Sequence, residues 1–451
     1  MNNCEDRSGI SFDIIILGDG SAGIALAAQL GRFGFRVAVL GKADARRAYE
    51  GLSERTIEVL KFLGLTNAFD NVLCHAPRNV SWNGVASSAN IERLIDRKRF
   101  SLALIEDCQK SQAFYFRGRI GRVAMLNGVW RIDLLDDDKT QTIAARYLVE
   151  ARGRRAPRHG HKLARGCSTI SISQIYRQCQ TASPGAWLTS LPNGWCWQAC
   201  AGDGYGVVQV VISGNEPGLS RPGAARRFFG EALEYLSPLR AQFGAQAAPA
   251  DSLRVRDVSP ILAIGAAGTR SLRVGDAAYS IDPLSGHGHF EAIGGAMAAA
   301  AVINTIFNRP HQGEMAIRFY NERCANAFAH HAQTGRGFYQ KEKQWPNQLF
   351  WRERREWLGD AMLFGEKKPT ASIIETRPVI ENDFVVERSV VVTDRHPRGA
   401  WIVDGVPVIE LLKILREQRP ECSVDQLANH FNVAPTQLAS AAGWLVENKL
   451  L

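Results

Sequence analysis

The sequence lacks the long apolar segments of a membrane protein. No run approaches the ~18 consecutive apolar residues that a membrane-spanning helix needs. The opening stretch, MNNCEDRSG, lacks the basic flank and the apolar core of a secretory signal. We therefore expect no membrane partner and a cytoplasmic location.

Paired cysteines are also missing. The nine cysteines are scattered along the chain, and no Cys-x-x-Cys pair occurs. Such spacing predicts neither a zinc site nor a disulfide framework. We expect reduced thiols and no metal.

Acidic residues are in deficit, and the formal net charge is +9. Many basic residues gather in one stretch, between 152 and 165. That stretch has none of the interleaved aromatic side chains on which single-stranded nucleic acids stack. We therefore expect no nucleic-acid partner. A solvated basic face, or one that meets an anionic cofactor, accounts better for the charge.

The clearest pattern that is present lies near the N-terminus. An apolar run at 12–17 is followed by a glycine-rich turn, a helical run and a second apolar run at 36–40. Strand, glycine turn, helix and strand form the context in which a GxGxxG motif predicts dinucleotide binding, with the phosphates at the helix N-terminus. The residues expected at the cofactor are Gly18, Gly20, Ser21, Ala22 and Gly23.

One part of this pattern departs from expectation. The acidic residue that should end the second strand and hold the ribose hydroxyls is replaced by Gly41-Lys42. Asp44, Arg46 or Glu50 are candidates to replace it, and the sequence leaves these alternatives open. We include Lys42, Arg46 and Glu50 among the expected cofactor contacts.

A second glycine-rich stretch, GDAAYSIDPLSGHGHFE, runs from 275 to 291 and leads into an Ala/Gly-rich helix at about 292–306. Glycines at a strand-to-helix turn let backbone approach a ligand closely, and the helix N-terminus favours negative charge. An ordinary tight turn is the alternative. The expected cofactor contacts here are Gly275, Asp276, Pro283, Gly286, His287 and Gly288.

Between the two motifs lie long β segments, which predict a substrate-side sheet over about 75–110 and 167–260. A helix opens at 96–105, and its Arg97 is a candidate for a phosphate or cofactor edge, with a plain surface arginine as the alternative. Trp195 and Trp197 are either a wall for an aromatic substrate or core residues. His330 and His331 lack ligand partners at suitable spacing, so we expect solvated or core histidines.

The C-terminal part differs in kind. A strand-like run, VVERSVVVTD, precedes three short helices that begin near Pro407, Ser423 and Pro435. This order resembles a small winged-helix module. A DNA reader needs a basic helix face, but acidic residues outnumber basic ones from Pro407 onward. We expect a peptide- or protein-docking module, with a structural cap as the alternative.

These motifs together resemble single-component FAD-dependent flavoprotein monooxygenases and the related tryptophan halogenases, over about 10–360. The resemblance rests on the GxGxxG turn, Asp96-Arg97, the stretch from Glu150 to Arg154, and the stretch from Gly275 to Gly288. It implies an α/β (α+β) protein: a Rossmann-like FAD-binding domain with an inserted β-sheet substrate domain, similar to p-hydroxybenzoate hydroxylase. The expected domains are 1–368 for this core, 369–378 for a linker, and 379–451 for the winged-helix-like module.

Halogenases of this group carry a WxWxIP stretch and an essential lysine. Here the stretch around Trp195 departs from that pattern, and the lysine region offers Cys74-His75. Within the group the chain resembles the monooxygenases that build tryptophylquinone cofactors by dihydroxylating a tryptophan in the small subunit of an amine dehydrogenase or oxidase. This resemblance implies a polypeptide substrate, molecular oxygen, and an external reductant, either NAD(P)H or reduced flavin.

The implied chemistry is oxygen transfer from a flavin C4a-hydroperoxide to an indole ring. His287 and His289 are the nearest titratable candidates for acid–base steps, with a backbone-only contact at residue 287 as the alternative. We group His287, His289 and Trp195 as catalytic candidates. Other functions left open are halogenation, hydroxylation of a small aromatic, and a non-catalytic flavoprotein chaperone.

Overall fold

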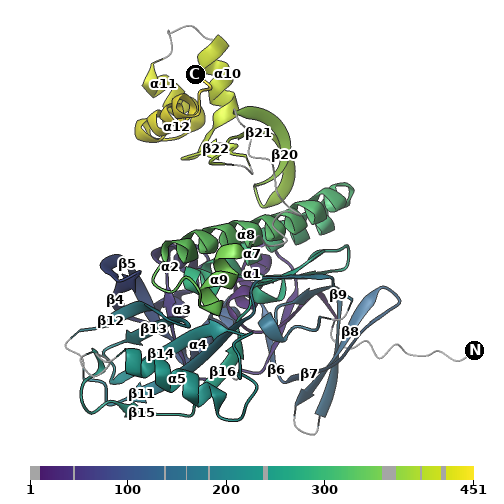
Figure 1. Ribbon diagram of the computed structural model, residues 1–451. Coiled ribbons are helices and arrows are strands. Elements are labelled where there is room, and N and C mark those ends of the chain that lie inside the picture. The colour runs from purple at the N-terminus through teal and green to yellow at the C-terminus, as the bar shows by residue number, and fades with distance from the viewer. Residues whose placement is uncertain are drawn as a thin grey trace, which may run out of the picture. The chain divides into compact units, whose positions relative to one another are not determined.

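A computed structural model describes residues 11–43, 46–136, 139–158, 160–180, 183–236, 242–357, 372–396, 399–417 and 423–451 (Figure 1). The chain divides into two compact units, residues 1–300 with 320–362, and residues 301–319 with 363–451. Each unit is described by itself.

The first unit contains a seven-stranded sheet in the order β6-β2-β1-β9-β8-β7, with β18 also paired to β9 (Figure 1). Strands β6, β2, β1, β9 and β18 run parallel, and β8 and β7 are antiparallel additions. The strands are β1 Ser11–Leu17, β2 Val37–Gly41, β6 Phe114–Arg117, β7 Arg119–Leu126, β8 Val129–Asp136, β9 Lys139–Glu150 and β18 Ser271–Arg273. The strand–helix–strand unit predicted at the N-terminus is confirmed, with α1 at Ser21–Arg32.

A nine-stranded sheet forms the substrate side, in the order β15-β11-β14-β13-β12-β4-β5-β3, with β16 also paired to β11. Its strands are β3 Tyr49–Leu52, β4 Val72–Trp82, β5 Val85–Asp96, β11 Thr169–Arg177, β12 Gly185–Leu191, β13 Gly194–Cys200, β14 Tyr205–Ser213, β15 Ala248–Pro249 and β16 Arg254–Asp257. A small third sheet joins β10 Leu163–Arg165, β17 Ile261–Ala263 and β19 Tyr279–Ser280. The spans predicted for the substrate-side sheet, about 75–110 and 167–260, also contain two helices, α4 Arg97–Lys110 and α5 Ala224–Tyr235.

Alternation along β13 separates the two faces of the nine-stranded sheet. Trp195 and Trp197 pack into one core cluster with Tyr339. Cys196 and Cys200, which point the other way, pack against α5. Besides α1, the described helices of this unit are α2 Glu54–Phe62, α3 Thr66–Asp70, α4 Arg97–Lys110, α5 Ala224–Tyr235, α7 Gly288–Asn308, α8 Gly313–Lys341 and α9 Leu349–Glu356, of which α7 and α8 continue into the second unit.

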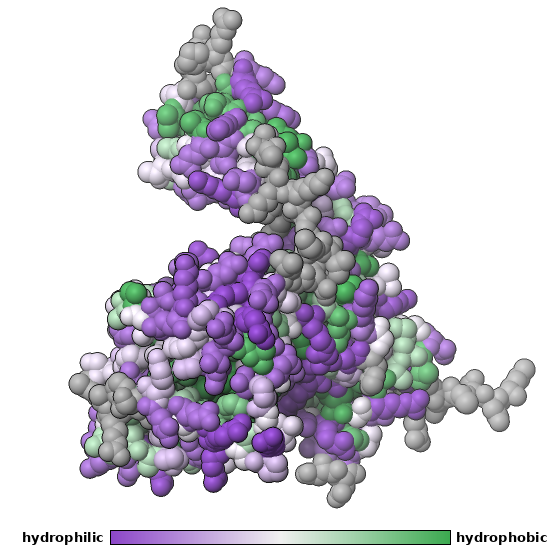
Figure 2. Space-filling model, viewed as in Figure 1, coloured by the Kyte–Doolittle hydropathy of each residue, from purple (hydrophilic) through white to green (hydrophobic). Residues whose placement is uncertain are grey.

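Helix α7 is long and apolar enough to cross a membrane by length and composition alone, with a mean hydropathy of 1.5. The protein buries 61% of its most apolar window, however, which is typical of a core helix. The helix is rich in alanine and glycine, and their small side chains allow it to pack closely in the core. The visible surface is mostly hydrophilic (Figure 2). Helix α7 contains no run of 18 consecutive apolar residues, since His289, Glu291 and Asn304 interrupt it.

Besides the parts of α7 and α8 that extend into it, the described residues of the second unit form two β-hairpins and three α-helices. These are β20 Ile373–Glu381 with β21 Phe384–Val392, β22 Ile402–Val403 with β23 Val406–Pro407, and α10 Val408–Glu417, α11 Val424–Phe431 and α12 Pro435–Glu447. Ser423 caps α11 in a capping box, which confirms the predicted helix start. The predicted linker at 369–378 is wrong from residue 373 onward, because β20 begins there; residues 369–371 lie outside the described part.

Candidate FAD-binding and substrate site

The N-terminal glycine turn is built by backbone packing. Gly18 has a φ of +122°, and a Cβ there would lie 2.4 Å from the carbonyl oxygen of Ala151. A Cβ at Gly23 would lie 2.2 Å from the carbonyl oxygen of Gly18. These two glycines therefore fit the strand and the helix together, as the motif predicts.

Gly20 differs from its two neighbours in the motif. It is exposed, and a Cβ there would meet no protein atom within 4 Å. Gly20 is the N-cap of α1, where it provides no side-chain cap, and the first turn of α1 contains no acid. The helix thus presents its first N–H groups to open space, and an anionic phosphate fits there.

The second glycine motif lies against the first. Gly275 has a φ of +57°, and a Cβ there would lie 2.8 Å from the Cβ of Ala22. The turn that contains Gly275, η2 Gly275–Ala277, follows β18, whose parallel neighbour β9 is paired to β1. Both motifs therefore stand at the carboxyl ends of parallel strands that are each paired to β9, where open α/β sheets bind ligands.

The stretch from Glu150 to Arg154 supports this edge of the sheet. The carboxylate of Glu150 accepts hydrogen bonds from the backbone N–H (3.0 Å) and Nε (2.9 Å) of Arg152. Arg154 lies 3.4 Å from the carboxylate of Asp276 and donates to the carbonyl of Ser259 at 2.7 Å. These arginines have protein partners here, so we assign them to holding the turn after β18 in place.

A polar network joins the two motifs to the strand that precedes α2. His289 Nδ1 lies 2.9 Å from Ser21 Oγ, and His289 Nε2 lies 2.7 Å from Glu50 Oε2. Arg97 donates to Glu50 Oε1 at 2.9 Å. Burial raises the pKa of Glu50, but Arg97 and His289 outweigh burial and hold it well below its usual value. Glu50 is therefore ionised at neutral pH.

Asp96 sets the position of Arg97. Its side chain is 2% exposed and caps α4 by accepting from the backbone N–H of Lys98 at 2.9 Å. It also accepts from Arg47 at 3.1 Å. The Asp96-Arg97 pair in the sequence is thus a cap followed by the first residue of a helix.

The expected cofactor contacts that follow β2 in sequence differ in their surroundings. Lys42 and Arg46 are exposed, and Glu50 belongs to the network with Arg97 and His289. Asp44 lies outside the described residues. None of these described positions places an acid at the end of β2.

The turn before α7 is shaped by its own cap. Asp282 accepts from the backbone N–H of Leu284 at 2.9 Å and leads into the short helix η3 Pro283–Ser285. Gly286 follows with a φ of +64°, and Gly288 begins α7. Gly286 and Gly288 are both exposed, so backbone N–H groups near the start of α7 are open to a ligand.

One turn into α7, Glu291 holds a second cluster. Tyr279 donates to Glu291 at 2.5 Å, and His331 Nε2 lies 3.1 Å from the other carboxylate oxygen. Burial raises the pKa of Glu291, but the hydrogen bonds from His331 and Tyr279 outweigh burial and lower the pKa to about 2. No acid stands at ligand spacing near His331 in sequence, but α7 and α8 bring together residues that are distant in the chain and give His331 a carboxylate partner.

His287 lies beside this cluster, with its ring centroid 6.2 Å from that of His331. Burial is the main cause that lowers the pKa of His287 below its usual value. The imidazole is therefore neutral at pH 7. It can accept a proton as well as donate a hydrogen bond.

Both tryptophans of β13 belong to hydrogen-bonded chains. Trp195 is 2% exposed, and its Nε1 donates to Tyr339 Oη at 3.3 Å; Tyr339 in turn donates to Asp282 at 2.9 Å. The burial of Trp195 favours the core alternative over a substrate wall. Through Tyr339 it supports the turn before α7.

Trp197 Nε1 donates to Glu92 Oε2 at 3.2 Å, and Glu92 lies 3.3 Å from Arg78 Nη1. A Cβ at Gly286 would lie 3.7 Å from the same Arg78 nitrogen. Arg78 Nε is buried and has no hydrogen-bond partner within the described protein. Sequence reasoning missed Arg78 and Glu92, since only the pairing of β4 with β5 and β12 brings them to Trp197.

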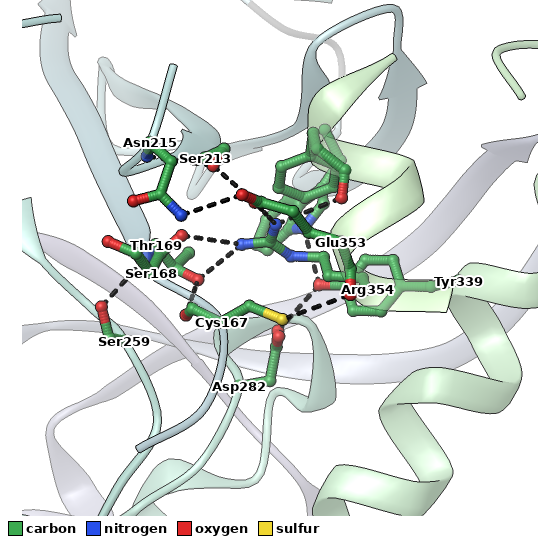
Figure 3. Close-up of polar contacts among 12 residues, drawn as sticks. Cys167, Ser168, Thr169, Ser213, Asn215, Ser259, Asp282, Tyr339, Glu353 and Arg354 are labelled. Atoms are coloured by element: carbon green, nitrogen blue, oxygen red, sulfur yellow. Dashed lines mark hydrogen bonds and ion pairs between the residues drawn. The ribbon is translucent and has the colours of Figure 1, made fainter. Parts of the chain in front are cut away.

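A further cluster ties α9 to the nine-stranded sheet (Figure 3). Arg354 is 2% exposed and donates to Thr169 Oγ1 at 2.5 Å. The neighbouring Glu353 accepts from Ser213 at 2.7 Å and from Asn215 at 2.8 Å. These bonds hold α9 against β11 and β14, and its Phe350 and Trp351 pack into the same core cluster as Trp195 and Trp197.

Comparisons with known proteins agree with this geometry. The solved structure of the peptidyl tryptophan dihydroxylase QhpG, described as essential for tryptophylquinone cofactor biogenesis, is 34% identical, with a TM-score of 0.77, and covers 98% of this chain and 100% of its own. The flavin-dependent halogenase CmlS is 16% identical, with a TM-score of 0.75, and covers 98% of this chain and 96% of its own, which shows the fold alone.

A curated relative, the FAD-dependent oxidoreductase LodB of Marinomonas mediterranea, is 24% identical over 76% of this chain and 97% of its own length. No protein-family profile matches. FAD fits the residues present, because the open space at Gly20 and the uncapped start of α1 suit its phosphates. The predicted fold class and family are confirmed. The chain belongs to the family of FAD-dependent monooxygenases and related flavin-dependent halogenases, and is an FAD-dependent oxidising enzyme.

Proposed function

We propose that this enzyme hydroxylates, in one or two rounds, a tryptophan carried by a polypeptide, as a step in building a tryptophylquinone cofactor. The observation that carries the proposal is the 34% identity to a peptidyl tryptophan dihydroxylase across 98% of the chain. The polypeptide would be the small subunit of an amine dehydrogenase or oxidase.

The substrate-side strands favour oxygen transfer over halogenation. The resemblance to halogenases calls for a lysine in this region, but β4 and β5 contain none. Burial raises the pKa of the Cys74 thiol to about 11, and His75 contacts Arg93. Neither residue supplies the free ammonium that a lysine would.

When bound and reduced, FAD activates oxygen, and each round would insert one oxygen atom into a C–H bond of the indole. Each round uses one O₂ and two electrons from an external reductant, NAD(P)H or reduced flavin, and releases the second oxygen atom as water. The chain's part is to bind, orient and exclude water. The open N–H groups at the start of α7 would stabilise negative charge on the cofactor edge.

We assign different roles to the two histidines. His287 is half-buried and neutral, so it can take a proton from the hydroxylated ring. His289 has both ring nitrogens engaged, with Ser21 and Glu50, and we assign it to positioning. Arg78, whose Nη1 lies near Gly286, is an additional candidate to hold the cofactor edge or the substrate carbonyl.

The C-terminal module is proposed to dock the polypeptide outside the catalytic site. Its three helices form their own core, centred on Leu411, Ala441 and Leu445. A small-aromatic hydroxylase would need no such module. This assignment accounts for the acidic balance of its surface, which suits a protein partner better than DNA.

The test is the intact mass of a tryptophan-bearing small subunit after incubation with the enzyme, FAD, a reductant and air. We expect a gain of one or two oxygen atoms on tryptophan, and its loss in the Gly20→Ala variant. Gly230→Ala is the matched control, since its Cβ also meets no atom within 4 Å but lies in α5. A chlorinated product would identify a halogenase. Unchanged peptide with oxidised free indole would identify a small-molecule hydroxylase.

A further inference from the structure

The end of β2 is the place where a dinucleotide fold normally positions an acid against the ribose hydroxyls. Here that position is Gly41, and the chain has departed from the pattern. The glycine is not a simple loss, however. A Cβ at Gly41 would lie 2.2 Å from Oδ2 of Asp19 and 2.5 Å from its Cβ.

Asp19 therefore fills the space that the missing side chain would occupy. It stands between Gly18 and Gly20 in the glycine turn, and its side chain reaches across to the end of β2. Its Oδ2 accepts from the backbone N–H of Ala43 and from Tyr115 Oη, both at 2.9 Å. Two donors on one oxygen hold the carboxylate in a fixed orientation.

Oδ1 remains for a ligand. An ionised carboxylate offers about four lone-pair sites on two oxygens, and the donors named above both use Oδ2. Asp19 is half-buried and directly precedes the exposed Gly20. The carboxylate thus lies beside the space in which the phosphates fit, at the end of the strand where the ribose is expected.

We propose that Asp19 is the residue that binds the 2′- and 3′-hydroxyls of the adenosine ribose of FAD, and that Gly41 is required to make room for it. The acid has moved from the strand end to the glycine turn. This exchange explains the one departure from the motif, a glycine at the strand end, by the acid inside the glycine turn. The proposal concerns cofactor binding and does not depend on the substrate.

The alternative is that Asp19 only holds the loop after β2, through Ala43 and Tyr115. Both roles predict that losing Asp19 weakens FAD binding. They differ in whether the loss depends on the ribose hydroxyls, and in whether an acid at residue 41 restores binding. The experiment is built on these two differences.

Apoprotein is titrated with FAD and with the FAD analogue whose adenosine ribose lacks both hydroxyls, and flavin fluorescence reports binding. The wild-type protein should prefer FAD by roughly 10- to 100-fold, the range for hydrogen bonds to a charged group. In Asp19→Gly the preference should fall to about one. In the double variant Asp19→Gly/Gly41→Glu it should return.

Gly41→Glu alone should weaken FAD binding, because the new side chain meets Asp19, whereas the same change strengthens binding in the Asp19→Gly background. The effect of Gly41→Glu on FAD affinity should thus change sign between the wild-type and the Asp19→Gly background. This comparison does not require either single variant to bind FAD as tightly as the wild-type protein. Tyr115→Phe is the matched control; it loosens the loop and keeps the carboxylate, so the preference for FAD should persist. An equal loss of both ligands in Asp19→Gly, with no recovery in the double variant, would overturn the proposal. Asp19→Asn, read by the same ratio, replaces Asp19→Gly if the latter fails to fold.

Discussion

At the seven-stranded sheet, the close contacts that shape the site are between backbone atoms, such as Gly23 against the carbonyl of Gly18. At the nine-stranded sheet they are between side chains from separate strands, such as Trp197, Glu92 and Arg78. The first kind depends on a short local stretch. The second depends on the register of strands that are far apart in sequence.

The difference indicates which kind of substitution disrupts each site. Close backbone contacts are disrupted when a methyl group is added, whereas a buried ion pair destabilises the protein when one partner is removed. The predictions below use these two modes of failure, beginning with the largest effect.

Arg78→Met should have the largest effect, on the substrate side. It leaves the carboxyl of Glu92, whose side chain is 9% exposed, without its cation. Removing one partner of a buried ion pair costs about 3–5 kcal/mol. Urea denaturation measures this loss. The matched control is Arg78→Met with Glu92→Gln, which removes the buried charge and keeps an acceptor for Trp197. A double variant no more stable than the single one would contradict the importance of charge at this sheet.

Glu291→Gln should change how stability depends on pH. The pKa of Glu291 in the folded protein is about 2, below its ordinary value of 4.5. A depressed pKa contributes stability that is present above about pH 4.5 and is lost as the pH falls toward 2, worth about 3 kcal/mol in total. The unfolding free energies of wild type and variant should therefore converge as the pH falls from about 4.5 toward 2. Parallel curves would show that Glu291 gains nothing from His331 and Tyr279.

Two glycines of one motif should respond differently to the same methyl group. Gly23→Ala forces a Cβ against a carbonyl oxygen and should lower apoprotein stability by about 2–3 kcal/mol. Gly20→Ala meets no protein atom, so apoprotein stability should change by less than about 1 kcal/mol while FAD affinity falls. Thermal unfolding without and with FAD separates the two. If both variants destabilised the apoprotein equally, Gly20 would also be required for packing, and not only for the close approach of FAD.

Trp195→Phe should give the smallest effect. It keeps most of the buried ring and loses the hydrogen bond to Tyr339, at a cost of about 1 kcal/mol. Tyr339→Phe removes the same bond and also the one to Asp282, so it should cost more. The order of the two in urea denaturation tests whether the chain from β13 to the turn before α7 acts as a unit.

The features that sequence reasoning predicted are those decided locally. The glycine turn before α1 and the start of α11 at Ser423 each depend on a few consecutive residues. Their physics, steric exclusion and short-range capping, is contained in those residues.

What was missed depends on partners distant in the chain. The carboxylate partner of His331 was not predicted, and Arg78 and Glu92 were not selected, because nothing near these residues in sequence indicates the contacts. The linker error has another cause. Asn382-Asp383, both with positive φ, lies between two apolar alternating runs and was a usable hairpin signal for β20 and β21.

The contact of Gly275 with Ala22 has a consequence for synthesis of the protein. Half of the nucleotide site is in β1 and α1, and the other half, at the turn after β18, is translated much later. At about 5–20 residues per second, roughly 10 to 50 seconds separate the two. Strand β18, which lies beside β9, arrives with the second half. The nascent chain must therefore protect an incomplete parallel sheet during that interval, and FAD can first be captured only after the start of α7 has emerged.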